Sequence, residues 1–393
     1  MRQNKALLGK YFPSFFSIEL SDTKDIYSTT IIDNCTLFHE YIHFLQDITT
    51  TSGFVKLYNV KENINLIRTQ TIGTQEISVP YQFDEKNQIN EAVFEVIDSY
   101  DVNHFFNYQI KKIEKNDLNR AVRLTISDGK RDTVCFFGSY QIEEIMAECC
   151  ESQHSHHQDT NEYPYDLWLR FNEYFKYDLR KEDYALISYV SLFSCFPGYE
   201  FIFILDSIRR GTALETALKN SFSNHKKDWI LFKQHAIDSM KYFFSENFPA
   251  ICQWYEKCVD QNNLLEDFDH IKVFLRDMLH EQSLFSQFVQ NQGIPIVSDC
   301  YDERNNDCHY GFGVNKDYDS KDFYALIALR DIYNLLLYGR KPCTMVTMCY
   351  ESGHGGVSLD CGISPWCSNH GDRKCYYEVM WNALFLPKQV NIL

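Results

Sequence analysis

The run NCTLFHEYIHFLQD, residues 34–47, contains two histidines in the motif HEYIH, at positions 39 and 43. Residues four apart lie on the same face of an α-helix, so His39 and His43 can offer their imidazoles to one metal ion. Glu40 turns toward the edge of that face, where its carboxylate can act as a base. The run itself favours a helix, because apolar residues recur at intervals of three and four, at Phe38, Tyr41, Ile42 and Leu45. We therefore predict a metal-binding helix over residues 34–47.

Signals at both ends bound this helix. Asp33 and Asn34 are suitable N-cap residues, and the run TTTSG at residues 49–53 predicts its end. Asp47 lies one turn after His43. It is therefore predicted to accept the second ring N–H of a ligand histidine and to fix the orientation of that ring.

A chance match is the main alternative reading of the motif. The chain has 13 histidines in 393 residues, and a random H-E-x-x-H is then expected in roughly a few per cent of such chains. The run HEYIHFLQD resembles the active-site helix of the zincin metallopeptidases. Its acidic residue four places after the second histidine is similar to the thermolysin-like, glutamate-liganded (gluzincin) branch. The resemblance covers about a dozen residues and implies a class of chemistry rather than a substrate.

A second helix is predicted over residues 138–151, GSYQIEEIMAECCE, with Ser139 as its N-cap. Its apolar stripe is Ile142, Ile145, Met146 and Cys149. Glu144, Glu148 and Glu151 share the opposite side. In glutamate-liganded zincins a second helix carries the third ligand, and an acidic residue one turn later orients a histidine. The resemblance therefore implies Glu144 as third ligand and Glu148 as the orienting carboxylate.

Two alternatives to Glu144 stay open. Carboxylates four apart on a helix are common on solvated faces. His104 or the histidines of the run HSHH, residues 154–157, are the other candidates for a third ligand.

Composition narrows the class of protein. The 54 acidic and 38 basic residues give a net charge of −16, which disfavours binding to nucleic acid or to an anionic membrane. No signal peptide or run of transmembrane length is evident. We expect a cytoplasmic protein whose 14 cysteines are mostly reduced thiols.

The rest of the chain is predicted to be mainly helical. A strand is expected over residues 11–20, a short helix over 104–115, and a β-hairpin over 120–137 through the pair Asp128-Gly129. Further helices are expected over residues 166–177, 181–195, 200–210, 212–221, 225–244, 264–290 and 321–338.

The predicted fold class is α+β, mainly α-helical, with a zincin-like metal-binding lobe that includes a small β-sheet and a larger helical lobe. We expect a catalytic lobe over residues 1–160, a helical lobe over 161–340 and a Cys/His-rich C-terminal segment over 341–393 packed on the body.

Two further groups of residues are candidates for function. The polar loop over residues 299–319 offers His309 or Tyr310 to stabilise an oxyanion, as zincins usually do with a tyrosine or histidine. The C-terminal segment offers four ligands for a structural zinc, Cys361, Cys367, His370 and Cys375. Buried thiols and turn residues are the alternative for these cysteines.

These features together predict a zinc metallopeptidase with Glu40 as general base and acid on a zinc-bound water. Its partner is a protein or peptide substrate, with a regulatory protein as a second expected partner. A zinc hydrolase of a non-protein substrate and a noncatalytic metal-binding or interaction protein are the alternatives.

Overall fold

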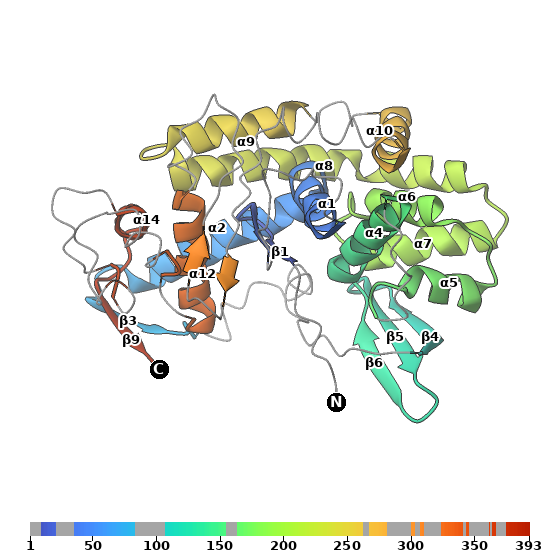
Figure 1. Cartoon of the computed structure of the whole chain (residues 1–393), viewed down its shortest axis with the longest axis horizontal. Helices are drawn as coiled ribbons and strands as arrows, with labels where there is room; N and C mark the ends of the chain where they lie inside the picture. Colours follow the sequence, from blue (N-terminus) through green and yellow to red (C-terminus); the bar gives the residue numbers. More distant parts are fainter. Residues whose placement is uncertain are drawn as a thin grey trace.

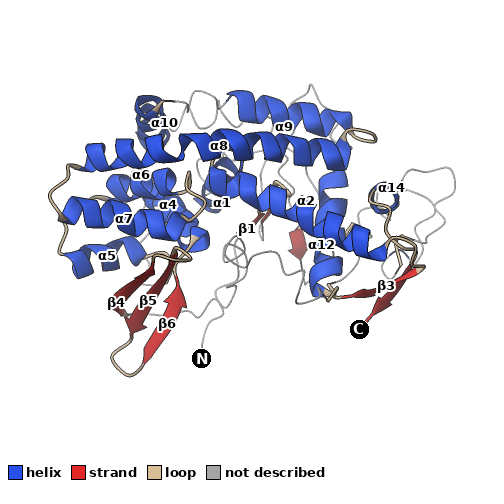
Figure 2. Cartoon of the chain, turned by 180° about the vertical axis from the view of Figure 1, so that it is seen from behind, coloured by secondary structure: helices blue, strands red, loops and turns tan. Residues whose placement is uncertain are grey.

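The computed structural model describes residues 9–20, 35–82, 107–154, 163–261, 267–280, 300–302, 307–309, 324–340, 343–345, 361, 364–366 and 375–393. Helices predominate in these ranges (Figure 2). They are α1 (Cys35–Thr49), α2 (Thr51–Thr71), α4 (Ser139–His154), α5 (Leu167–Phe175), α6 (Lys181–Ser191), α7 (Pro197–Arg209), α8 (Leu214–Phe244), α9 (Pro249–Gln261), α10 (Phe268–His280), α12 (Tyr324–Tyr338) and α14 (Tyr376–Ala383). The predicted class, α+β and mainly α-helical, is confirmed.

The strands form small separate sheets. They are β1 (Gly9–Phe12), β2 (Ser17–Leu20), β3 (Glu76–Val79), β4 (Gln109–Asn116), β5 (Ala121–Ser127), β6 (Asp132–Phe136), β7 (Cys300–Asp302), β8 (Asp307–His309) and β9 (Gln389–Ile392). β4, β5 and β6 make a three-stranded antiparallel sheet, and β3 pairs in parallel with β9. The other two sheets are the antiparallel pairs β1–β2 and β7–β8.

The helix that carries the histidine motif forms as predicted. α1 buries the whole expected stripe, and each of Phe38, Tyr41, Ile42 and Leu45 is at most 5% exposed. Its last carbonyl, that of Thr49, accepts a hydrogen bond of 2.7 Å from the indole Nε1 of Trp229 in α8. This contact satisfies a carbonyl that has no partner inside the helix, so α8 holds the C-terminal end of α1 in place.

A tight corner joins α1 to α2. Thr50 is the N-cap of α2, and its hydroxyl oxygen accepts from the backbone N–H of Gly53 at 3.2 Å. A Cβ on Gly53 would lie 2.3 Å from the Cα and the carbonyl oxygen of Asp47. The close approach of the two helices therefore requires glycine at this position.

Three predictions of local structure were wrong. Residues 104–115 were expected to include a helix, but residues 109–116 form β4, because this segment pairs with β5 along its length. The strand predicted over residues 11–20 is instead the β1–β2 hairpin, whose turn places Ser14 and Phe16 at positive φ. The helices predicted over 212–221 and 225–244 are the single helix α8, because no glycine or proline interrupts residues 214–244.

The elements meet around one core. α1 packs against α2 and α4, α4 packs against α6, and α2 lies along the long helix α8 (Figure 1). The β3–β9 pair brings the last residues of the chain beside α2 and α12. One cluster of buried side chains includes Phe44, Trp254 and Trp381, which come from the predicted catalytic lobe, the predicted helical lobe and the predicted C-terminal segment. Among the described residues, no helix combines the length and apolarity needed to cross a membrane.

Candidate metal centre

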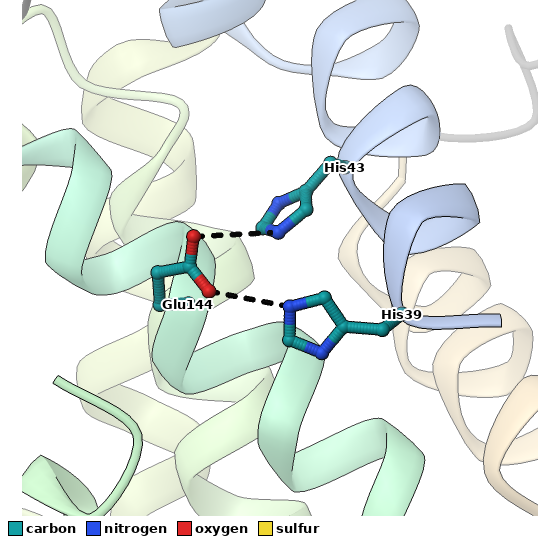
Figure 3. A group of neighbouring side chains, drawn as sticks. All are labelled: His39, His43 and Glu144. Carbon is teal, nitrogen blue, oxygen red and sulfur yellow. Dashed lines mark hydrogen bonds and ion pairs between the residues drawn. The ribbon is translucent and has the colours of Figure 1, made fainter. Parts of the chain in front are cut away.

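Three side chains from α1 and α4 converge on one point. His39, His43 and Glu144 each offer a ligand atom, and these atoms all lie within 4.8 Å of one another. Figure 3 shows the two imidazoles on one face of α1 directed at the carboxylate on α4. No other group of this kind occurs in the described part of the chain.

These atoms lie close enough together for one metal ion to bind all three side chains. Nε2 of His39 lies 3.2 Å from Oε2 of Glu144, and Nε2 of His43 lies 3.6 Å from Oε1 of the same residue. Ligands at the usual zinc bond lengths are about 3.3 Å apart in a tetrahedral site. Two imidazoles and one carboxylate are also a donor set that catalytic zinc uses, since it leaves a fourth position open. The three residues could therefore hold a metal ion.

In the pKa values of His39, His43 and Glu144, the interactions between charged groups together outweigh the effect of burial. Burial lowers the pKa of His39, but hydrogen bonds with Glu144 and Glu151 raise it well above its usual value. Burial likewise lowers the pKa of His43, and the Glu144 carboxylate raises it overall. For Glu144 burial favours the protonated acid, yet the two histidines hold its pKa far below the usual range. The metal-free site therefore favours two imidazolium rings around an ionised carboxylate.

Glu40 lies near enough to both histidines for its charge to raise their pKa values. Its carboxyl group is buried, and burial raises its pKa despite the opposing effect of His43 and His39. The backbone N–H of Tyr11 donates a hydrogen bond to it. A carboxylate with a raised pKa is a better proton acceptor near neutral pH than an ordinary glutamate.

The ring orientation of His43 is fixed by Gln46, not by Asp47 as predicted. Nδ1 of His43 donates to Oε1 of Gln46 at 2.8 Å, and Nε2 of Gln46 donates to the backbone oxygen of Glu143 at 3.1 Å. The second contact fixes the amide, so its oxygen faces the ring and the proton of neutral His43 stays on Nδ1. This leaves Nε2 of His43 available as a ligand atom.

Asp47 belongs to a different network. Its Oδ2 accepts hydrogen bonds from the Tyr11 hydroxyl at 2.9 Å and from the Ser14 backbone N–H at 2.7 Å. Nζ of Lys56 lies 3.9 Å from Oδ1 of Asp47 and 2.6 Å from Oε1 of Glu143. Burial raises the pKa of Asp47 to about 6 against the opposing charge of Lys56. Asp47 thus ties the β1–β2 turn to α1, and its contribution to the centre is structural.

The orienting carboxylate for His39 is Glu151, where Glu148 was predicted. Nδ1 of His39 lies 3.1 Å from Oε2 of Glu151, two helical turns after Glu144 on the same face of α4. Glu148 is buried on α4, at 6% exposure. Nε2 of His39 faces Glu144, whereas Nδ1 lies on the opposite side of the ring. The carboxylate that reaches Nδ1 is therefore the one two turns further along α4.

The remaining predicted residues stay predictions. His309 ends β8 and pairs with Cys300 through the backbone, but its side chain and all of Tyr310 lie outside the described residues, as does His104. The HSHH run is described only at the backbone of its first residue. Of the proposed structural zinc ligands, Cys361 is buried and Cys375 caps α14, while Cys367 and His370 lie outside the described residues.

Two aromatic residues next to the histidines were missed. The ring of Tyr11 stacks on His43 with centroids 6.4 Å apart, and Tyr165 meets His39 edge to face at 6.1 Å. No periodicity links these residues to the motif, since they come from β1 and from the segment before α5. By contrast, Gln46 and Glu151 had a signal, because they lie three and seven places from ligands on the same helices.

Comparison of the chain with protein-family models, with curated proteins and with solved structures finds no match.

Proposed function

We propose that this protein is a zinc-dependent metallopeptidase that hydrolyses peptide bonds in a protein or peptide substrate. The observation that carries the proposal is the convergence of His39, His43 and Glu144 on one point, with the buried carboxyl of Glu40 beside the histidines. A bound zinc ion at such a site lowers the pKa of a water ligand and polarises a substrate carbonyl.

The chain's own residues supply the proton transfers and the alignment. The carboxylate of Glu40 would accept the proton of the attacking water, and the resulting acid would donate it to the departing amine. Gln46 and Glu151 would hold the two imidazoles with Nε2 toward the ligand position. Among the described residues the cysteines are free thiols, which supports placing the activity in the reducing cytoplasm.

Elemental analysis of protein purified without added metal tests the centre. We expect about one zinc per chain in the wild type, and its loss in both His43→Ala and Glu144→Gln, because each change removes one of three ligands. Glu246→Gln, an exposed glutamate beyond the end of α8, is the matched control and should keep its zinc. A second zinc that survives both changes would point to the C-terminal cysteines, and no zinc in the wild type would refute the proposal.

Hydrolysis by the Glu40→Gln protein separates the peptidase from a noncatalytic metal protein. We expect this variant to keep zinc and to lose about 10²–10⁴-fold in the turnover of fluorescein-labelled casein, the range ascribed to general acid–base catalysis. If Glu40→Gln cleaved casein as fast as the wild type, the catalytic role of Glu40 would be wrong. If zinc-loaded wild type cleaved neither casein nor a mixed peptide library, the peptidase proposal would be refuted, and a hydrolase of a non-protein substrate and a noncatalytic metal protein would be the two alternatives left.

A further inference from the structure

A cavity lies among elements that include both β1 and α4, the helix that carries Glu144. It has a volume of about 420 Å³ and is enclosed by the β1–β2 turn, α2, the start of β5, the beginnings of α4 and α7, and the end of α12. Its wall is rich in aromatic rings, among them Phe12, Phe137 and Phe196. The volume falls within the range of ligand pockets in proteins, and segments from most of the chain contribute to it. Neither the three metal ligands nor Glu40 line it.

The cavity and the metal centre share α4 and β1. Residues 138–141 and Glu143 line the cavity, and the next residue, Glu144, is a metal ligand. Successive helical residues rise by about 1.5 Å, so the start of α4 lies roughly 7–8 Å along the axis from Glu144. On β1, Phe12 lines the cavity while the preceding Tyr11 stacks on His43.

The cavity is cationic in a chain of net charge −16. Four basic side chains line it, those of Lys10, Lys56, Arg120 and Arg340, against the single acidic side chain of Glu143. Glu143 is already paired with Lys56 at 2.6 Å. Within the described ranges, neither Arg120 nor Arg340 forms an ion pair.

The two arginines are placed for recognition of carboxylates. Both are exposed, and each guanidinium lies 5.1 Å from an aromatic ring centroid, that of Phe196 for Arg120 and that of Tyr338 for Arg340. Stacking on a ring limits the orientations of a guanidinium while leaving its N–H groups free to bind a carboxylate in bidentate fashion. The cavity therefore suits a ligand with an aromatic group that contacts the aromatic wall and with anionic groups that contact the two exposed arginines.

We infer that this cavity binds an acidic peptide segment with a large aromatic side chain, and that the segment belongs to the substrate cleaved at the metal centre. The inference rests on the proposed peptidase function and adds the substrate class. The aromatic side chain enters the cavity, and acidic residues on either side of it contact Arg120 and Arg340.

Binding to zinc-loaded Glu40→Gln protein tests the inference without turnover. The probe is a fluorescein-labelled peptide of alternating glutamate and phenylalanine, followed by anisotropy at low salt. We expect the double change Arg120→Glu and Arg340→Glu to weaken its binding by about tenfold or more. The matched control is Arg210→Glu, an equally exposed arginine at the end of α7 that does not line the cavity. It should change binding by less than about twofold.

Two further peptides test the charged contacts and the aromatic contacts separately. A peptide with lysine for glutamate should bind weakly to the parent protein and more tightly to the double variant, and one with serine for phenylalanine should bind weakly to both. On the otherwise wild-type enzyme, the double change should lower kcat/KM for the acidic peptide in proportion to its loss of binding. Equal binding of the acidic and lysine peptides, or equal effects of Arg210→Glu and the double change, would overturn the inference. Casein hydrolysis would leave the proposed function standing in that case.

Discussion

Zinc uptake should release protons, because the raised pKa values of His39 and His43 favour protonated rings in the metal-free centre. The pKa of His39 is raised well above its usual value, and that of His43 is also raised, mainly through Glu144 acting against burial. Zinc binds only neutral imidazole, so each protonated ring must lose its proton before it can become a ligand. At pH 6 we therefore expect the release of about two protons per zinc bound, and the logarithm of the affinity should rise by about two per pH unit.

The Glu144→Gln protein should change both the affinity and the number of protons released. Loss of the charged ligand should weaken zinc binding by at least 100-fold, about 2.7 kcal/mol. The same loss removes the charge that raises both histidine pKa values, so at pH 7 the variant should release fewer protons than the wild type. Glu246→Gln, at an exposed position beyond the end of α8, should match the wild type in both respects.

Isothermal titration calorimetry in two buffers with different ionisation enthalpies measures the protons released. Competition with a chromophoric chelator at pH 6, 7 and 8 gives the affinities. Wild-type protein that bound zinc at pH 6 with no proton release would show that His39 and His43 are not both ligands. An unchanged affinity in Glu144→Gln would remove the carboxylate from the site.

Three further changes examine the surroundings of the centre. Gln46→Leu should weaken zinc binding about 10–100-fold, the usual effect of losing a ligand-orienting contact, and an unchanged Kd would deny the contact with His43 any role. Gly53→Ala would place a Cβ 2.3 Å from the Asp47 backbone. The free energy of unfolding, measured with urea, should therefore fall by about 3 kcal/mol. A decrease below about 0.5 kcal/mol would contradict the close approach of α1 and α2 at this corner. The Asp47 pKa is raised from its usual 3.8 to about 6, so the folded state binds this proton more tightly and stability falls as the pH rises through that interval. Between pH 4 and pH 7, the free energy of unfolding of metal-free Asp47→Asn should therefore rise by about 2 kcal/mol relative to that of the wild type. Parallel plots of unfolding free energy against pH for the two proteins would show that Asp47 does not titrate in this way.

The first helix and the placement of its two histidines on one face could be predicted because they depend on one segment only. The apolar stripe at Phe38 and Leu45 determines which way α1 faces the core, and this places His39 and His43 together on another face. Glu144 followed from the same geometry on a second helix, with the resemblance to zincins supplying the pairing of the two helices. The periodicity of a single helix was therefore sufficient to predict which side chains share one of its faces.

The orienting residues could not be assigned in this way, because their roles depend on the packing of other elements. Asp47 is one turn from His43, yet the β1–β2 turn presents Tyr11 and Ser14 to its carboxylate and draws it away from the ring. Gln46 takes its place because α4 offers the Glu143 carbonyl, which fixes the amide. The cavity is even less visible in the sequence, since its lining comes from six separate segments.

Protonated histidines can balance the negative charge of the buried carboxylates in the centre when no metal is bound. With both histidines protonated, two positive charges face the carboxylates of Glu40, Glu144 and Glu151, and a divalent ion bound to neutral histidines would supply the same positive charge. Zinc and two protons are therefore close to interchangeable in charge, and the buried carboxylates are compensated in either state. Above the histidine pKa values only the metal maintains that balance, because two buried carboxylates would otherwise face neutral rings. The contribution of zinc to stability should accordingly increase with pH, while the packing of α1 on α4 stays the same.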